Sequence, residues 1–381
     1  MQPPLLSQEN YLIYTGKNMI DRNLLRNIDW ILIGLLLLNS VIGVAFIYSS
    51  SHYLPENYFL KQIFWILLGL IALFLFLSID YKALVAFSFF FYIISIGLLG
   101  GVLLFGKLVG GARSWIRFPF LQVQPSEIAK IVLILLLVYL FSKFRKDYVS
   151  WRKGLLGGAL TAVPVFLVAV QPDLGTALSY IPIFLSSLIL AGLNRKIFIF
   201  ILVVILTLGV AVWNFGLKDY QKNRLTTLIF PGQDPLGSGY HIIQSKIAIG
   251  SGGFLGKGFG KGTQSQLRFL PARHTDFIFS VIGEEFGFIG VVLVMLFYFF
   301  FILRLFRSIG LSRDRAGVYI IFLVAMMITF QFFINVMMVI GLFPIAGIPL
   351  PLLSYGGSSL LTNYLGISLV LNVKMRRFVN V

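Results

Sequence analysis

The sequence lacks cysteine, contains few charged residues and has a small share of acids. Its 381 residues include no Cys, and 14 Asp plus Glu stand against 31 Lys plus Arg. Without cysteine the chain forms no disulfide and no thiolate metal site, so the redox compartment stays open. Charged residues make up only 12% and hydrophobic residues 58%, which excludes an ordinary soluble domain. Short segments of alternating polarity are also absent, which excludes an outer-membrane barrel.

Long apolar runs fill the chain instead. Runs of about 17–25 residues can each cross a hydrocarbon core of roughly 30 Å. We predict ten such spans, at 30–50, 60–78, 84–105, 125–142, 154–171, 175–192, 197–215, 277–303, 317–340 and 358–373. The sequence therefore predicts an all-α integral membrane protein with about ten transmembrane helices.

The positions of the basic residues predict the orientation. Short loops on one face carry a large group of cations: Lys143, Arg145, Lys146, Arg152, Lys153, Arg195, Lys196, Arg304, Arg307, Arg313, Arg315, Lys374, Arg376 and Arg377. The positive-inside rule makes this face cytoplasmic. With an even number of spans, both termini are predicted to be cytoplasmic, and the protein is expected in the inner (cytoplasmic) membrane.

These assignments give a simple domain organisation. Residues 1–29 form a polar cytoplasmic tail that lacks a small-residue cleavage site. Residues 30–373 form one polytopic membrane domain, and 374–381 form a second cytoplasmic tail. One large extracytoplasmic loop, 216–275, lies between helices 7 and 8.

Basic residues also occur on the predicted outer face. The loop at 106–124 carries Arg113, and the large loop carries Lys246, Arg268 and Arg273. Long loops translocate despite positive charge, so a solvated basic loop is one interpretation. The other is that the outer face receives a large anion, such as anionic lipid or a phosphate-bearing substrate. No nucleic-acid partner is expected.

Two stretches of the large loop are distinctive. YHIIQSKIAIG, from Tyr240, predicts a short amphipathic helix on the membrane surface, and it carries Gln244 and Lys246. GSGGFLGKGFGKG, from Gly250, allows close backbone approach, as a phosphate cradle requires. It is not a Walker loop, and a flexible surface loop is the alternative.

Ionisable residues at the edges of spans are candidate functional groups. In QPSEIAK, Glu127 and Lys130 lie three residues apart, so they share a helix face and can pair. The pair either serves a site or only connects two helices. In QPDLGTA, Asp173 either serves a site or caps the following helix.

Asp276 lies between a basic, glycine-rich stretch and a strongly apolar helix, in GTQSQLRFLPARHTDFIFSVIGEEFG. It follows Arg273 and His274 directly. An acid in a first helical turn is stabilised by the helix dipole, or Thr275 is the cap and the carboxylate is free for chemistry. Further along, Glu284 and Glu285 point in different directions, so one of them is expected to line a cavity.

GLFPIAGIPLPLLSYGGSS, which contains Ser358, predicts a broken segment whose unpaired backbone groups can line a site. In the predicted topology, this segment lies at the outer membrane face together with a set of ionisable residues: Arg113, Glu127, Lys130, Asp173, Lys246 and Asp276. An anion-binding, carboxylate-bearing site that opens outward follows from this arrangement.

At these motifs the chain resembles the SEDS family (shape, elongation, division and sporulation). QPSEIAK, QPDLGTA, PLPLLSYGGSS and the stretch around Asp276 carry the resemblance, which covers nearly the whole chain from about residue 29. TQSQLRFLPARHTDFIF is more similar to the RodA-type elongation members than to the FtsW-type division members.

The resemblance implies a ten-span peptidoglycan glycosyltransferase that polymerises lipid II at the outer face of the membrane during cell elongation. It implies a class B penicillin-binding protein as the crosslinking partner. The family's catalytic aspartate matches Asp276, its Glu and Lys match Glu127 and Lys130, and its QPD aspartate matches Asp173.

The expected reaction inverts the donor's anomeric carbon and releases undecaprenyl pyrophosphate. Asp276 is the candidate base for the acceptor hydroxyl. Arg113, Lys130 and Lys246, with or without a divalent cation (Mg²⁺ or Mn²⁺), would neutralise the leaving group. No metal-ligating side chain is predicted. The candidate substrate-binding residues are Arg113, Glu127, Lys130, Asp173, Gln244, Lys246, Arg273, His274 and Ser358. A lipid-linked precursor flippase and a non-catalytic scaffold are the alternatives.

Overall fold

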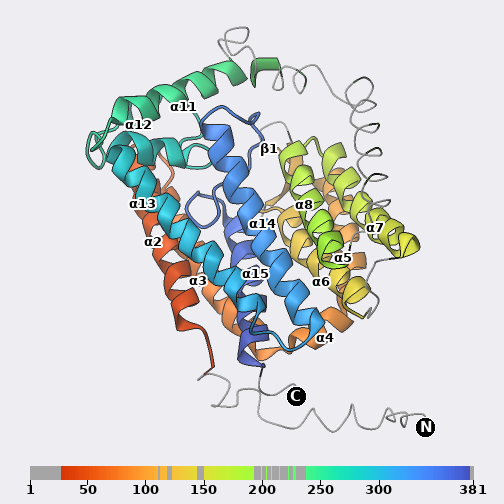
Figure 1. Cartoon of the computed structure of the whole chain (residues 1–381). Coiled ribbons are helices and arrows are strands. Elements are labelled where there is room, and N and C mark those ends of the chain that lie inside the picture. Colours follow the sequence, from red (N-terminus) through yellow and green to blue (C-terminus); the bar gives the residue numbers. More distant parts are fainter. Residues whose placement is uncertain are drawn as a thin grey trace, which may run out of the picture.

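The computed structural model describes residues 27–109, 112–117, 122–143, 150–192 and 237–377, with a few isolated positions between 199 and 228. This part of the chain is a bundle of helices that run up and down between two ends (Figure 1). The helices are α2 (Trp30–Ser51), α3 (Tyr58–Ser78), α4 (Tyr81–Ala86), α5 (Ser88–Phe105), α6 (Pro125–Ser142), α7 (Trp151–Val170), α8 (Leu174–Leu190), α11 (Ser238–Gly252), α12 (Thr263–Gln266), α13 (Ile278–Ile309), α14 (Arg315–Val339) and α15 (Gly357–Met375). We call the end that holds α11 and α12 the upper end, and the end that holds α4 the lower end (Figure 1).

Most of the predicted spans are present as helices. Seven helices are long and apolar enough to cross a membrane: α2, α3, α5, α6, α7, α13 and α14. The predicted spans at 175–192 and 358–373 correspond to α8, which has 17 residues, and α15, which has 19. The span predicted at 84–105 is divided at Phe87 into α4 and α5. The span predicted at 197–215 lies outside the described residues, apart from isolated positions.

Several helices begin at residues that favour a helix start, either a proline or a capping aspartate. Pro125 opens α6, where a missing N–H costs nothing. The side chains of Asp29, Asp173 and Asp314 accept a hydrogen bond from the backbone N–H three residues on, at 3.1–3.2 Å, at the starts of α2, α8 and α14. The prediction that Asp173 caps the following helix is confirmed.

The prediction of an all-α protein is wrong for the segment between α5 and α6. There β1 (Lys107–Val109), β2 (Ala112–Arg117) and β3 (Gln122–Val123) form a small antiparallel sheet in the order β1-β2-β3. Lys107 pairs with Trp115, and Ile116 pairs with Val123. The strands are too short for a visible alternation, so the sequence pattern does not reveal them. The last strand leads directly into α6 and places its first residues at the upper end of the bundle (Figure 1).

Helix α15 lies inside the bundle (Figure 1). Of its residues only Leu361 is not buried, and the buried residues include Thr362, Asn363 and Asn372. Asn372 donates to the carbonyls of Phe76 and Ile79, at 2.7 and 2.6 Å, and so completes the end of α3. The polar residues of α15 explain why this central helix carries a weaker apolar signal than its neighbours.

The glycine-rich stretch after α11 is bound to α13. Gly287 interrupts α13 with φ 61°, and the next N–H donates to the carbonyl of Gly253 at 2.9 Å. In return, the N–H groups of Lys257 and Gly258 donate to the carbonyls of Glu284 and Glu285, at 3.0 and 2.9 Å. A Cβ on Gly287 would lie 2.4 Å from the backbone nitrogen of Gly256, so only glycine fits. The glycines therefore serve close backbone packing, and these two N–H groups are not available to a phosphate.

The amphipathic helix predicted at 240–250 is present as α11. It buries Ile242, Ser245 and Ala248 and exposes Lys246. The Ser245 hydroxyl donates to the carbonyl of Val339 at 2.6 Å. Helix α11 therefore packs against the upper end of α14, and its position on a membrane surface stays a prediction.

Candidate active site

Asp276 lies in a tight loop directly before α13. The helix begins at Ile278, with Phe277 at its N-cap, so Asp276 lies outside the first helical turn. Thr275 is not the cap, because its hydroxyl donates to the carbonyl of Ala272 at 3.1 Å. Both predictions, Asp276 in the first helical turn and Thr275 as the cap, are therefore wrong. Ala272 has φ 47°, and its carbonyl accepts the N–H groups of residues 275–277 at 3.1–3.3 Å, which holds this strained loop in one shape.

The predicted broken segment is present as the non-helical residues 341–356 between α14 and α15. Asn335, near the end of α14, connects this segment to the Asp276 loop. Its Nδ2 donates to the carbonyls of Asp276 and Ile348, at 2.9 and 2.8 Å. A Cβ on Gly347 would lie 3.9 Å from Asp276 Oδ2, so the carboxylate faces the broken segment.

Ser354 forms a second connection. Its hydroxyl donates to the carbonyl of Thr275 at 2.5 Å and accepts the N–H of Leu350 at 2.9 Å. The N–H of Tyr355 donates to the carbonyl of His274 at 2.9 Å. The Asp276 loop and the broken segment thus form one hydrogen-bonded unit, which fixes the backbone on both sides of the carboxylate.

Arg273 and His274 point into the protein. Arg273 is 6% exposed, and its Nε donates to the carbonyl of Ser50 at 2.5 Å. The His274 ring lies 4.3 Å from the Tyr58 ring and 5.9 Å from the Tyr355 ring. Burial, aided by the charge of Arg273, lowers the pKa of His274 to about 4, so this ring is neutral at pH 7. In this conformation both side chains position the loop.

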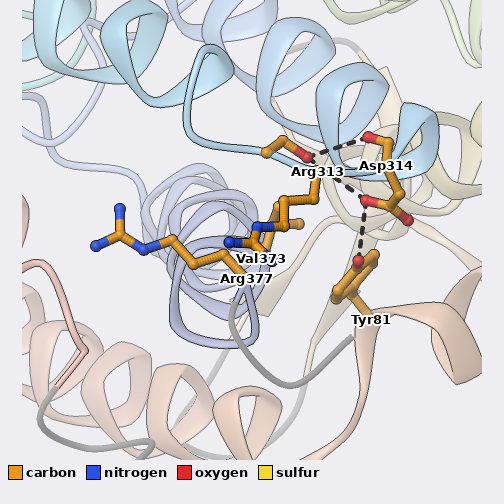
Figure 2. A pocket seen from close by; sticks show the side chains of 6 residues that line it. Tyr81, Arg313, Asp314, Val373 and Arg377 are labelled. Carbon is orange, nitrogen blue, oxygen red and sulfur yellow. Dashed lines mark hydrogen bonds between the residues drawn. The ribbon is translucent and has the colours of Figure 1, made fainter. Parts of the chain in front are cut away.

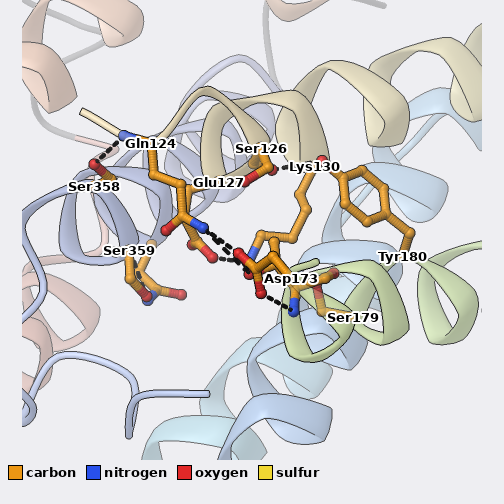
Figure 3. Close-up of polar contacts among 11 residues, drawn as sticks. Gln124, Ser126, Glu127, Lys130, Asp173, Ser179, Tyr180, Ser358 and Ser359 are labelled. Carbon is orange, nitrogen blue, oxygen red and sulfur yellow. Dashed lines mark hydrogen bonds and ion pairs between the residues drawn. The ribbon is translucent and has the colours of Figure 1, made fainter. Parts of the chain in front are cut away.

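A second polar cluster lies where α6, α8 and α15 begin (Figure 3). The Lys130 ammonium lies 2.7 Å from Glu127 Oε1, which confirms the predicted pair. The side chains are 1% and 6% exposed, so the pair is almost fully removed from water. Glu127 Oε2 is buried and has no hydrogen-bond partner among the residues that the structure describes. A buried pair with one unsatisfied oxygen is costly, which favours a functional role over a purely structural one.

Gln124 connects α6, which carries the Glu127–Lys130 pair, to α8 and α15. Its Nε2 donates to Asp173 Oδ2 at 2.6 Å, and its backbone N–H donates to the Ser358 hydroxyl at 2.8 Å. Thr176 also donates its hydroxyl to Asp173 Oδ2, at 2.9 Å. Burial raises the pKa of Asp173 and the charge of Glu127 adds to the rise, whereas the bonds from Thr176 and the charge of Lys130 oppose it.

The two clusters meet at the broken segment. Gly175, in the first turn of α8, lies against Ala346, and a Cβ on Gly175 would be 1.7 Å from the Ala346 carbonyl oxygen. The next residue, Gly347, faces Asp276. The Asp173 turn and the Asp276 loop therefore border the same short stretch of chain, 346–347.

The remaining candidates lie nearer the surface of the upper end. Lys246 on α11 is exposed, and its Nζ would be 2.7 Å from a Cβ on Gly341. Gln244 is half-buried on the same helix, and Arg113 is exposed on β2. The structure does not place these three in hydrogen-bond contact with the Glu127 or Asp276 clusters.

Glu284 and Glu285 are both buried and bonded within the protein. Glu284 accepts Lys257 Nζ at 2.9 Å and the N–H groups of Gln264 and Ser265 at 2.7 and 3.1 Å. Glu285 accepts the hydroxyl of Ser49 from α2. The two carboxylates do point in different directions, as predicted, and each binds a neighbouring element.

Gln124, Asn335 and Ser354 are the residues that sequence reasoning missed. Gln124 is the first residue of the QPSEIAK motif. Asn335 is a polar residue inside an apolar span, and such residues often mark functional sites. Ser354 lies in the motif PLPLLSYGGSS, but its bond to the Thr275 carbonyl spans 79 positions, which no local pattern indicates.

Among the described residues, no group of three or more His, Asp or Glu side chains is arranged to hold a metal ion. The carboxylates near the broken segment therefore form no ready-made metal site.

Comparison with known proteins gives consistent matches. A family model for FtsW, RodA and SpoVE, described as cell cycle protein, matches residues 27–378. The peptidoglycan glycosyltransferase MrdB of Escherichia coli K12 is 40% identical over 288 residues, covering 76% of this chain and 78% of that protein. The peptidoglycan glycosyltransferase RodA of Treponema pallidum is 35% identical, covering 92% of this chain and 98% of that protein.

Solved structures show the same fold. A chain from a structure described as the coordination of polymerization and crosslinking by a peptidoglycan synthase complex superposes with a TM-score of 0.79 at 30% identity. RodA of Thermus thermophilus, a rod shape determining protein, superposes with a TM-score of 0.70 at 29% identity. Each alignment covers 92% of this chain and 98% of the other.

Proposed function

The chain belongs to the FtsW/RodA/SpoVE family of cell cycle proteins, and from this premise we propose that it is a peptidoglycan glycosyltransferase. It is a multi-pass membrane protein that polymerises lipid II into glycan strands during cell elongation. The observation that carries the proposal is the Asp276 carboxylate, which faces a broken backbone segment that the Asp173 turn also borders. The charges of the buried Glu127–Lys130 pair act on Asp173 in that turn. The names of the relatives at 35–40% identity support the same activity.

The proposed topology places the upper end outside the cytoplasmic membrane and the lower end inside. Ten spans, a single membrane domain at 30–373 and two cytoplasmic tails complete this arrangement. The distribution of basic residues at the lower end, including Arg313, Arg315 and Arg376, supports it. A reporter fused after residue 377 would be active in the cytoplasm, and activity outside would contradict the topology.

In the proposed reaction, the Asp276 carboxylate takes the proton of the acceptor's 4-hydroxyl group. The acceptor oxygen then forms a bond to the anomeric carbon of the donor's MurNAc, and the bond from that carbon to the pyrophosphate oxygen breaks. The configuration inverts from α to β, and undecaprenyl pyrophosphate leaves. The bonds from Asn335 and Ser354 hold the loop in place, which limits the reorganisation required in the transition state.

The cations divide into two groups. Arg113 and Lys246 are exposed and can meet the pyrophosphate directly. Lys130 is 1% exposed and held by Glu127, so it acts at a distance or after a local opening. A divalent cation, Mg²⁺ or Mn²⁺, held mainly by pyrophosphate oxygens would add to this neutralisation, and no step above depends on it. Gln244 and Asp173 complete the proposed substrate-binding surface. Ser358 is buried, so its proposed role is to position Gln124 by accepting its backbone N–H.

The proposed partner is a class B penicillin-binding protein, which crosslinks the strands. A related chain comes from a peptidoglycan synthase complex that combines polymerization and crosslinking. We therefore expect the polymerase to be most active when it is bound to that partner.

The test is glycan-strand formation from purified lipid II, with the partner present and its transpeptidase serine disabled. Asp276→Asn should abolish long strands while the complex still forms, because an amide cannot accept the acceptor's proton. Asp80→Asn is the matched control, since it removes one carboxylate at the lower end and an Asn still caps α4. Equal product from wild type and Asp276→Asn would place the base elsewhere. No product from folded wild-type complex would favour a flippase or a scaffold.

A further inference from the structure

The glycine-rich turn that follows α11, residues 253–261, exposes large apolar side chains. Leu255 is 75% exposed, Phe254 66% and Phe259 46%. We call this stretch the 253–261 turn. Exposed apolar side chains gathered in one short stretch mark a surface that contacts another apolar phase, either a protein or a lipid. The position of the turn along α13 decides between these two.

The 253–261 turn lies beside α13, well below the beginning of that helix. The N–H groups of Phe288 and Ile289 donate to two carbonyls of the turn, at 2.9 and 3.3 Å. The Phe254 ring stacks on the Phe288 ring, with centroids 5.7 Å apart. Since α13 begins at Ile278 and rises about 1.5 Å per residue, Phe288 lies about 15 Å below the first turn of the helix.

The lower end of the bundle marks one boundary of the membrane. Arg304 and Arg307 lie in the last turns of α13. Figure 2 shows Tyr81, Arg313 and Arg377 around one small pocket at the same end. Arginine at the cytoplasmic ends of spans and tyrosine at the interface are typical of headgroup level. The hydrocarbon core therefore begins close to Arg304 on α13.

The other boundary follows from the thickness of the bilayer. A hydrocarbon core of about 30 Å takes about 20 helical residues, which places its upper boundary near Glu285. The burial pattern of α13 agrees with this level. All its residues from Ile278 to Glu285 are buried, whereas Phe286, Phe288 and Ile289 are exposed. The surface that α13 presents to lipid thus begins at the level where the 253–261 turn adjoins it.

The polar groups of the turn are bound to the protein, as this depth requires. Irregular backbone at membrane depth is tolerated only where other protein groups satisfy its hydrogen bonds. Backbone bonds to α13 satisfy two N–H groups and two carbonyls of the turn. The Lys257 ammonium lies 2.9 Å from Glu284 Oε1. The Phe259 ring contacts the rings of Phe46 and Phe286, with centroids 6.3 and 6.4 Å apart.

We propose that the 253–261 turn is a membrane anchor in the leaflet at the upper end. Phe254 and Leu255 insert among the acyl chains, next to the exposed rings of α13. Lys261, which is exposed at the end of the turn, lies at the level of the lipid phosphates. The anchor holds the end of α11 and the upper part of α13 at a fixed depth. It does not depend on the proposed catalytic function.

Spin labels on single cysteines test the depth directly, because the chain contains no cysteine of its own. The full chain is placed in nanodiscs of phosphatidylethanolamine and phosphatidylglycerol. Oxygen collects in the hydrocarbon and a nickel chelate stays in water, so the ratio of their collision rates with a label reports its depth. Leu255→Cys carries the test label, and Lys261→Cys carries a second one.

Two further labels are the matched controls. Leu293→Cys, at a 50% exposed position of α13, reports hydrocarbon, and Asn57→Cys, exposed before α3, reports water. We expect the oxygen-to-nickel ratio at Leu255 to be close to that at Leu293 and several-fold above that at Asn57. The ratio at Lys261 should fall between them.

Two outcomes would overturn the anchor. A ratio at Leu255 equal to that at Asn57 would place the turn in water. A label at Leu255 that neither oxygen nor the nickel chelate reaches would show that protein covers the turn, and the apolar side chains would then belong to a protein interface. Each of the four labelled positions is exposed, so a label there displaces no buried group.

Discussion

Gly175 lies so close to Ala346 that a Cβ on Gly175 would be 1.7 Å from the Ala346 carbonyl oxygen. This contact joins the first turn of α8 to the broken segment. Because Asp173 caps that turn and Gly347 faces Asp276, one backbone contact sets the position of both carboxylates. The proposed active site thus depends on a glycine that carries no chemistry of its own.

Gly175→Ala should therefore be destabilising and should reduce strand synthesis. The added methyl group meets backbone, which cannot move as a side chain can, and we expect a loss of about 1–3 kcal/mol. The melting temperature of the detergent-solubilised chain measures this loss of stability. Gly100→Ala, in α5 with no atom within 4 Å of the new Cβ, is the control. That change should be neutral or stabilise by up to about 1 kcal/mol, since alanine favours helix. Similar melting temperatures for Gly175→Ala and Gly100→Ala would contradict the close contact between Gly175 and Ala346.

The buried Glu127–Lys130 pair predicts a non-additive result. Lys130→Met leaves a carboxylate buried without its cation, which costs about 3–5 kcal/mol in stability. Glu127→Gln leaves the ammonium unpaired at a similar cost. The double variant removes both charges, so it should be more stable than either single variant while remaining inactive as a polymerase. If the melting temperature of the double variant falls by as much as those of the two single variants together, the two side chains are not coupled.

Asp173 is tested by two replacements that separate capping from charge. Asp173→Ala should lose about 1 kcal/mol, because the N–H of Thr176 loses its acceptor. Asp173→Asn keeps a good cap and should melt near wild type. We expect both to lower strand synthesis at least about tenfold, because each removes a charge-assisted bond from Gln124. If Asp173→Asn retains full activity, Asp173 is only a helix cap.

His274 predicts a pH dependence of stability. Its pKa in the folded protein is about 4, below its ordinary 6.5, because the ring is buried and lies next to Arg273. As the pH falls below 6.5, the unfolded chain binds a proton that the folded chain does not, so stability is lost between pH 6.5 and 4. The melting temperature should fall over this window in wild type and fall less in His274→Gln. The exposed His52→Gln is the control, and an identical profile for His274→Gln and wild type would contradict the prediction.

Much of the architecture follows from the sequence by itself. The apolar runs predict a membrane-spanning helical bundle, since only helices satisfy every backbone group within one segment. Spacing along one helix predicts the Glu127–Lys130 pair, and the QPD turn predicts the cap at Asp173. Each of these features depends on residues within a few positions of one another, so a local pattern is enough to identify it.

Tertiary structure decided the features that connect distant parts of the chain. Gln124 binds Asp173 and Ser358, which are 49 and 234 positions away, and no spacing rule relates them. The sequence is compatible with a glycine-rich stretch that cradles a phosphate or forms a flexible loop. Only the tertiary structure shows that this stretch forms backbone hydrogen bonds with α13. Glycine permits many backbone shapes and specifies no partner. The partner is set by long-range packing, and so are the burial of Lys130 and the position of the Asp276 carboxylate against Gly347.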